Sequence, residues 1–223
     1  LVWKWYQKKF KGNESLIKGE DSTTYLASRC AAERISMQKK EIKLLFLLRQ
    51  PSLRAYSNYS HLLRSGRATY NFEDTIRYNP FQVINRSLYK EQLESFYKNI
   101  PKERIKVILF EDLVKNPELT IKEVSKFIGI DYDDFPEDAL KTHSNRGSVP
   151  RYGKLYLKKN LVLRNFGNLH YSNTLPFIDP SIKTTVPLIA RVINKIHGKI
   201  NPNVPITDEI NQETKKMLDV YFF

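Results

Sequence analysis

An arginine and a serine that could bind a phosphate stand eight residues apart, at Arg49 and Ser57. They follow the apolar run LLFLL at residues 44–48, and Pro51 lies between them. A planar guanidinium can bind a phosphate through two parallel hydrogen bonds, and a serine hydroxyl can donate another. Taken singly, Arg49 is more typical of a surface ion pair and Ser57 of a hydroxyl on a helix surface. If the helix that carries Ser57 folds back over the end of the strand, both side chains could bind the same phosphate.

Predicted strands and helices alternate along the chain, and they would position Arg49 and Ser57. Apolar runs at 44–48 and 105–110 predict strands, and the first is typical of a strand covered on both faces. Ligands of open parallel sheets bind beyond the carboxyl ends of the strands, which is where Arg49 stands. Helices are expected over residues 1–10, 27–38, 51–64, 72–78, 85–97, 119–128, 152–163, 181–196 and 207–222. This alternation predicts an α/β fold, in which a parallel sheet is flanked by helices and followed by a helical C-terminal part.

Charge and composition narrow the possible partners. The 223 residues carry a net charge of +13, which indicates an anionic partner such as a nucleotide, glycan, membrane surface or nucleic acid. Ten Lys or Arg but one acid, Asp179, fall between residues 143 and 200. Because they are spread among apolar helix positions, solvated helix faces are favoured over a nucleic-acid surface. One cysteine and four scattered histidines imply no metal, and no run approaches the roughly 20 apolar residues of a membrane span.

Three segments, in order and spacing, resemble the sulfotransferases that use 3′-phosphoadenosine 5′-phosphosulfate (PAPS). The strand followed by Arg49, Pro51, Arg54 and Ser57 resembles the family's 3′-phosphate-binding element. KGEDSTTYL at 18–26 is similar to its GE-x-[ST]-P-x-Y-L segment, with Thr24 in place of the proline. IKVILFEDLVKNPELTIKEVSKFIGI at 105–130 resembles its second strand, EDL turn and following helix, and WKWYQKKF at 3–10 its preceding helix.

The resemblance implies a P-loop-related fold, with residues 1–223 forming one sulfotransferase domain. It implies transfer of a sulfuryl group from PAPS to an acceptor hydroxyl or amine, with adenosine 3′,5′-bisphosphate as product and no metal. Arg49 and Ser57 would hold the 3′-phosphate. A late basic loop would complete that site through Arg146, Gly147 and Arg151, because glycine permits close backbone approach. The acceptor, a small molecule or a glycan, and the oligomeric state stay open.

The sequence also departs from the family's pattern. The phosphosulfate loop and its lysine should precede Leu1, and no GxxxxGK[ST] motif occurs. We therefore expect a domain incomplete at both ends. The resemblance also places the family's usual general base, a Glu or His, before Leu1, so no catalytic base is identified here. If these 223 residues are the whole protein, we expect no activity and an open sheet edge beside the 44–48 strand. If they nevertheless transfer sulfuryl groups, His61 and Glu20 are the first residues to test as the base.

Two further residues bear on the substrate and the compartment. Asp21 replaces a frequent lysine, and its carboxylate would repel sulfate groups, which disfavours heparan-type acceptors. Asn58 begins an N-glycosylation motif beside Ser57, where a glycan would be disruptive, and this leans towards a cytoplasmic location.

Two other functions are compatible with parts of this pattern. A P-loop nucleotide kinase or phosphotransferase would need an upstream Walker lysine and Mg²⁺. A non-catalytic basic module would need Lys and Arg interleaved with exposed aromatic residues. Glu111 and Asp112, at the end of the second predicted strand, could form an acid pair or satisfy backbone donors at a helix N-terminus.

Overall fold

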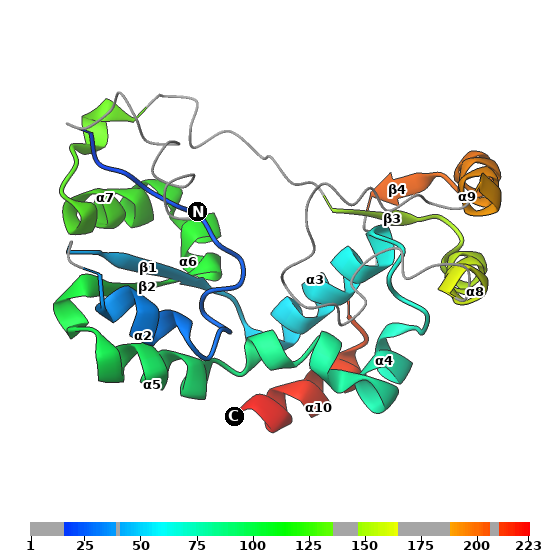
Figure 1. Cartoon of the computed structure of the whole chain (residues 1–223), viewed down its shortest axis with the longest axis horizontal. Coiled ribbons are helices and arrows are strands. Elements are labelled where there is room, and N and C mark those ends of the chain that lie inside the picture. The colour runs from blue at the N-terminus through cyan, green and yellow to red at the C-terminus, as the bar shows by residue number, and fades with distance from the viewer. Residues whose placement is uncertain (1–15, 39–40, 136–146, 165–187, 206–209) are drawn as a thin grey trace.

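The computed structural model of the protein describes residues 16–38, 41–135, 147–164, 188–205 and 210–223. The helices are α2 (Ala31–Ser36), α3 (Pro51–Arg64), α4 (Phe72–Tyr78), α5 (Tyr89–Asn99), α6 (Phe110–Lys115), α7 (Pro117–Ile128), α8 (Gly153–Arg164), α9 (Leu188–Ile200) and α10 (Gln212–Phe222). The strands are β1 (Leu44–Leu48), β2 (Ile105–Leu109), β3 (Ser148–Pro150) and β4 (Asn203–Pro205), and four short 3₁₀ segments join them. Figure 1 shows a sheet half built on β1 and β2 and a helical half that α3 enters.

The sheet half forms around two parallel strands. β1 and β2 pair in register from Leu44 opposite Ile105 to Leu48 opposite Leu109. On one face, α2 and α5 cover the strands, and the Phe46 and Phe96 rings meet edge to face at 4.8 Å. Side chains alternate between the faces of a strand, so every second residue of β1 enters this core.

The opposite face of the sheet is covered unevenly. On this side, α7 packs against β2, where Lys106 Nζ lies 2.9 Å from Glu123 Oε2. Leu45 and Leu47 of β1 remain 44% and 52% exposed. The prediction that β1 is covered on both faces is therefore wrong for the described structure, because the side chains of Leu45 and Leu47 stay exposed on the face opposite α2 and α5. Within the described ranges β1 has β2 as its single partner strand, and the open edge of the sheet stays a prediction.

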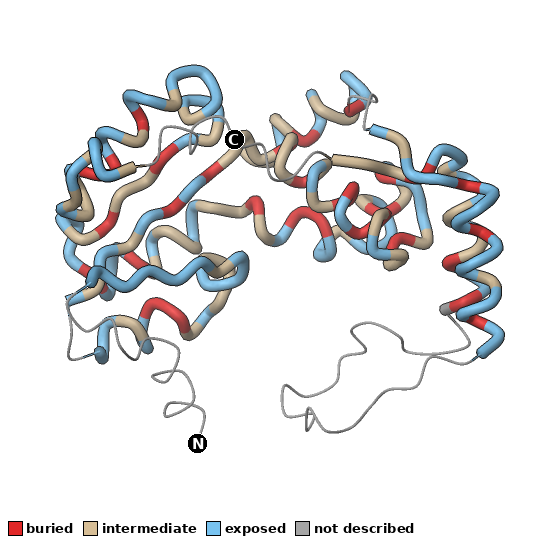
Figure 2. Tube along the Cα trace, turned by 90° about the horizontal axis from the view of Figure 1, so that it is seen from above, coloured by how far each residue is buried: buried red, intermediate tan, exposed pale blue. Residues whose placement is uncertain are grey.

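A second core lies in the helical half. α3 begins directly after β1 and buries Ala55, Tyr59, Leu62 and Leu63 against α4, α10 and the segment around Val83. In Figure 2, buried positions lie along the middle of this half. Gln50 Nε2 donates to Asp219 Oδ1 at 3.2 Å, which joins α10 to the start of α3.

A small antiparallel pair carries two projecting helices. β3 and β4 pair with Ser148 opposite Pro205, and β3 packs against α3. α8 follows β3, and α9 precedes β4; both extend from one end of the molecule (Figure 2). The ring of Tyr156 on α8 meets that of His197 on α9 at 5.3 Å. Asn201 exchanges hydrogen bonds with the backbone of Tyr152, which closes the base of this helical hairpin.

Most predicted elements are confirmed, with shifts at their ends. The expected helices at 51–64 and 72–78 match α3 and α4 in full. The helix expected at 27–38 begins at Ala31, because a turn precedes it in which Ser28 N–H donates to the Tyr25 carbonyl. The helix expected at 85–97 is divided into a 3₁₀ turn and α5, and the one expected at 119–128 begins earlier, at Pro117.

The C-terminal helices are shifted in the same way. The helix expected at 152–163 is α8, one residue later. The helix expected at 181–196 is α9, whose described part begins at Leu188 and which ends at Ile200. The helix expected at 207–222 is α10, which begins only at Gln212, because the Asn211 side chain caps it by accepting from the backbone N–H groups of Glu213 and Thr214. α6, β3 and β4 were not predicted from the sequence, because they are too short to show a hydrophobic period. The expected helix at 1–10 lies outside the described residues.

Candidate functional site

The carboxyl ends of β1 and β2 bring two separated segments together. Arg49 follows β1, and Glu111 lies in the first turn of α6, directly after β2. The Gln50 N–H donates to Glu111 Oε1 at 3.0 Å, at the N-cap of α3. Glu111 therefore satisfies a backbone donor at a helix N-terminus, which was the second of the two interpretations of Glu111 and Asp112.

The Arg49 side chain is held by packing. Its guanidinium carbon lies 5.1 Å from the centre of the Phe110 ring, and its backbone hydrogen-bonds to the Tyr89 side chain. Arg49 is partly buried, and its Nε has no hydrogen-bond partner among the described residues. A buried N–H donor without an acceptor is uncommon in a folded protein. Arg49 is thus a positioned cation whose hydrogen-bonding capacity is not used up internally.

The solvent-facing side of α3 carries further cationic groups. Arg54, Ser57, His61 and Arg64 follow one another at helical spacing, on the side opposite the buried residues Ala55, Tyr59 and Leu63. Arg54 Nη1 and Arg64 Nε are also buried without a hydrogen-bond partner in the described structure. Ser57 itself is exposed, and its neighbour Asn58 donates to the Gln82 carbonyl.

The pKa shifts show that these cations act on one another. Burial, followed by the charges of Arg67, Arg64 and Arg86, lowers the pKa of His61. Burial and the charge of Arg86 also lower the pKa of Arg54, against an opposing effect of Tyr89. Burial raises the pKa of Tyr89, while the charges of Arg54 and Arg49 lower it. We call this set the α3 arginine face; it comprises Arg49, Arg54, Ser57, His61, Arg64, Arg67 and Arg86.

An anion with several acceptor oxygens fits this face. Charge-assisted hydrogen bonds from guanidinium to phosphate are stronger than neutral ones, and like cations held together favour a multivalent anion. The unpartnered nitrogens of Arg49 and Arg54 supply donors at the start of α3, and that of Arg64 supplies another about 15 Å farther along the helix. The described residues contain no cluster of three His, Cys, Asp or Glu side chains that could hold a metal.

The late basic segment is only partly brought to the site. Gly147 precedes β3, which packs against α3, so the structure places this segment beside the helix that carries Ser57. Arg151 is exposed at the far end of β3; its backbone N–H donates to Pro202 and its guanidinium lies 5.6 Å from the Tyr152 ring. Arg146 lies outside the described residues. The assignment of Arg146, Gly147 and Arg151 to the phosphate site stays a prediction.

Three arginines of the face were missed in the sequence analysis. Arg64 stands seven residues after Ser57, a spacing that places both on one side of a helix, so this signal was available. Arg67 follows the end of α3. Arg86 comes from a separate 3₁₀ segment (Asn85–Ser87) that packs against α3, and no local pattern could have placed it there.

The family follows from comparison with known proteins. The family model of the sulfotransferase domain matches residues 4–161, most of the chain and all of β1, α3 and β2. The chain belongs to the sulfotransferase family. The match includes Arg49, Ser57 and the segment that begins β3.

Relatives of this sulfotransferase chain include glycan-modifying enzymes. Human heparan sulfate glucosamine 3-O-sulfotransferase 5 is 30% identical over 192 residues, which are 81% of this chain and 54% of that protein. Mouse heparan sulfate glucosamine 3-O-sulfotransferase 3A1 is 30% identical over 125 residues, 52% of this chain and 32% of that protein. The chain thus spans about half the length, or less, of these relatives.

A solved sulfotransferase has the same fold. The crystal structure of the sulfotransferase from Alicyclobacillus acidocaldarius matches with a TM-score of 0.53 and 27% identity, over 63% of this chain and 62% of that one. The predicted α/β sulfotransferase fold, with its parallel strands and helical C-terminal part, is confirmed.

Proposed function

We propose that this sulfotransferase chain carries the 3′-phosphate-binding part of an enzyme that transfers a sulfuryl group from PAPS to an acceptor hydroxyl or amine. The observation that carries the proposal is the Arg49 side chain. It stands at the carboxyl end of β1, packed over Phe110, with a buried Nε that lacks an acceptor. Ligands of parallel sheets bind at this edge, and a phosphate is the ligand that a guanidinium donor set prefers.

In this proposal, residues of the α3 arginine face bind the nucleotide and orient it. Arg49 would hold the 3′-phosphate, with Ser57 as a second donor and Gly147 allowing the following backbone to approach. When bound, PAPS supplies the sulfuryl group, and adenosine 3′,5′-bisphosphate leaves as the acceptor oxygen or nitrogen bonds to sulfur. Glu111 fixes the backbone of Gln50, beside Arg49, through its 3.0 Å hydrogen bond, so the guanidinium begins from a restrained position. No base is assigned: His61 has a lowered pKa among arginines, and Glu20 accepts a hydrogen bond from the Tyr25 hydroxyl.

A glycan is the acceptor class that we propose. The support comes from the relatives, whose names describe sulfation of a heparan sulfate glucosamine. Asp21 is exposed in a segment that precedes β1, and a carboxylate there would disfavour sulfate groups on the acceptor nearby. We therefore expect a glycan with few sulfate groups to be preferred over a highly sulfated one.

Nucleotide selectivity tests this proposal. The chain should bind adenosine 3′,5′-bisphosphate at least about 100-fold more tightly than adenosine 5′-phosphate, since two charge-assisted hydrogen bonds at ~1.5–3 kcal/mol each are lost with the 3′-phosphate. Isothermal titration calorimetry in EDTA measures both affinities. Equal affinities for the two nucleotides would show that Arg49 and Ser57 do not bind the 3′-phosphate. Binding that needs Mg²⁺ would favour a nucleotide kinase instead.

A further inference from the structure

The outer side of α9 carries two parallel rows of unlike side chains. Leu188, Val192, Ile196 and Ile200 recur every four residues and form an apolar row. Arg191, Lys195 and Lys199 form a basic row directly beside it. The opposite side of the helix holds the buried residues Ala190 and His197 and faces α8. The helix therefore has two apolar sides: one packs inside the protein, and the other forms a stripe on the outer surface.

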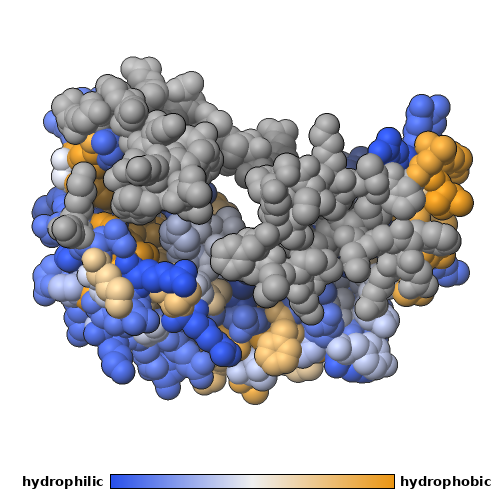
Figure 3. Space-filling view, in the orientation of Figure 1, coloured by the Kyte–Doolittle hydropathy of each residue, from blue (hydrophilic) through white to orange (hydrophobic). Residues whose placement is uncertain are grey.

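The apolar row is well exposed. Leu188 is 76%, Val192 47% and Ile196 53% accessible, and Ile189 adds to the same surface. Figure 3 shows hydrophobic side chains gathered over α9 at the edge of the molecule. Contiguous apolar surface bordered by polar residues marks an interaction site more often than scattered single residues do.

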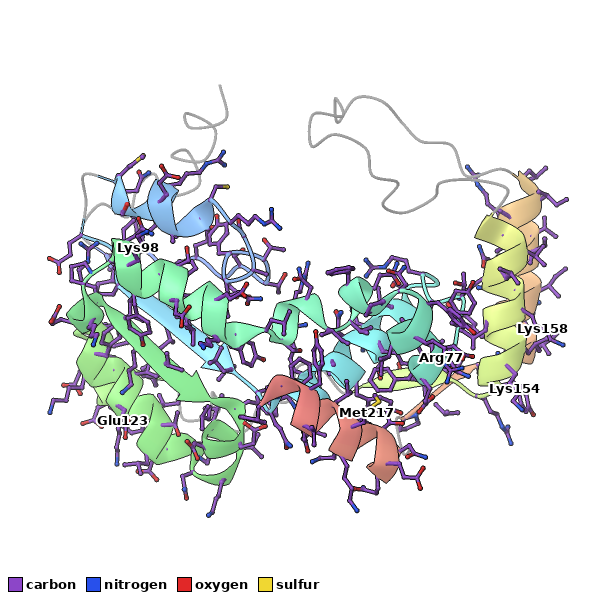
Figure 4. The ribbon with its side chains drawn as sticks, turned by 90° about the horizontal axis from the view of Figure 1, so that it is seen from below. Arg77, Lys98, Glu123, Lys154, Lys158 and Met217 are labelled. Carbon is purple, nitrogen blue, oxygen red and sulfur yellow. The ribbon has the colours of Figure 1, made fainter. Side chains whose placement is uncertain are left out.

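The charge around this row is of one sign. Residues 147–164 and 188–205, which form β3, α8, α9 and β4, contain five and three Lys or Arg and no Asp or Glu. Lys154 and Lys158 lie on α8 at the outer edge of the same hairpin (Figure 4). A second copy of this chain is a poor partner for such a surface, because the two hairpins would repel each other. The partner must be anionic and must also offer an apolar layer.

We propose that α9 is an interfacial helix that lies on an anionic lipid bilayer. An amphipathic helix with Lys and Arg beside its apolar residues lies in the plane of the bilayer, with the apolar side below the headgroups. The lysine stems can then run along the apolar surface while their ammonium groups contact lipid phosphates. No described helix is long and apolar enough to cross a membrane, and an interfacial helix needs no such length. A polyanion such as nucleic acid or heparin would satisfy the basic row alone and leave the apolar row in water.

The hairpin can take this position without disturbing the rest of the protein. Tyr156 Oη donates to the Arg64 carbonyl at 3.3 Å, and Asn160 Nδ2 donates to the Ala68 carbonyl at 2.8 Å, so α8 is fixed to the end of α3. Lys159 Nζ donates to Asn194 Oδ1 at 3.0 Å and fixes α9 to α8. All three contacts leave the outer rows of α9 free, so the inference does not depend on the nucleotide site.

Vesicle co-sedimentation with the full chain tests the proposal. Mixed vesicles of phosphatidylserine and phosphatidylcholine should bind the chain, and vesicles of phosphatidylcholine alone should bind it at least about tenfold more weakly, since the surface potential is lost. Lys195→Gln with Lys199→Gln should lower binding about 25-fold, roughly fivefold for each cation removed. Val192→Asn with Ile196→Asn should lower it about tenfold or more by removing apolar area from the interface.

Matched variants and a soluble polyanion complete the test. Lys98→Gln on α5 removes an exposed cation, and Val114→Asn on α6 removes an exposed apolar residue. Both helices belong to the sheet half, away from α9 (Figure 1), so both variants should leave vesicle binding unchanged. All variants should keep the melting temperature and the nucleotide affinity of the parent. The proposal is overturned if heparin binds while mixed vesicles do not, if neutral vesicles bind equally well, or if the Val192/Ile196 variant binds vesicles like the parent.

Discussion

Basic residues gather in two regions of this protein, and the regions hold their cations in different ways. On the α3 arginine face, guanidinium groups are partly buried, and nitrogens of Arg49, Arg54 and Arg64 lack internal acceptors. On α9, Arg191, Lys195 and Lys199 are exposed beside an apolar row. Restrained guanidinium donors can select one phosphate by geometry, whereas exposed cations create a diffuse attraction. The proposed phosphate site and the α9 surface therefore use cations in two different ways, within a chain whose net charge is +13.

The two regions also rest on different supports. The arginine face is built on α3, whose buried side belongs to the larger core around Tyr59 and Phe72. α9 touches the rest of the protein through α8 and the β3–β4 pair. A site that must fix one phosphate needs the rigid support, and a helix that lies on a deformable surface does not.

The largest expected effect is a loss of nucleotide affinity when the proposed phosphate ligands on the α3 arginine face are mutated. Arg49→Ala combined with Ser57→Ala should weaken binding of adenosine 3′,5′-bisphosphate by about 100-fold or more, because charge-assisted hydrogen bonds of ~1.5–3 kcal/mol each are removed. Vesicle binding should not change. Calorimetry and co-sedimentation on the same preparation give both values, with the Lys195/Lys199 variant as the reciprocal control. A parallel loss of both activities would show that the two regions are one surface.

An intermediate effect is expected from salt. Between about 0.1 M and 1 M salt the Debye length falls from ~10 Å to ~3 Å, and exposed charges are screened far more than partly buried ones. Vesicle binding through α9 should therefore fall at least about tenfold, while nucleotide affinity should fall only several-fold. Titrations of each ligand across this range measure both slopes. Equal slopes would contradict the distinction between restrained and exposed cations.

The smallest expected effect is a difference between two histidines. Burial and arginine charges lower the pKa of His61, and burial and Lys159 lower that of His197. A nucleotide phosphate on the arginine face should raise the pKa of His61 and leave that of His197 in place. The complex then takes up a proton at His61, so nucleotide affinity should rise by a few-fold as pH falls through the bound-state pKa, and level off below the free-state pKa.

Proton NMR titration of the two imidazole rings, with and without adenosine 3′,5′-bisphosphate, measures this difference. The pH dependence of the stability of the free protein checks the direction of both pKa shifts. Because both folded pKa values lie below the unfolded value of about 6.5, the unfolded chain binds protons more tightly, and stability should decrease as pH falls from that value through the folded ones. An unchanged His61 resonance on nucleotide binding would place the phosphate elsewhere.

The strand and helix that carry the proposed phosphate site could be predicted from sequence, because their parts are local. A strand, an arginine at its end, a proline at the first helical position and a serine two turns later all lie within residues 44–57. Backbone preference and side-chain period decide such a unit, and β1 and α3 begin and end where they were expected. The resemblance to sulfotransferases depended on the same short-range spacing, and the family match confirms it.

Only the tertiary structure decided which distant residues join this element and which apolar residues stay outside. Glu111 reaches Gln50 from 61 residues away, and Arg86 acts on His61 from a separate segment. Leu45, Leu47 and the apolar row of α9 have the pattern of buried residues and are exposed. Periodicity tells which side of an element is apolar, but not whether another element covers it, because burial depends on contacts between segments far apart in the chain.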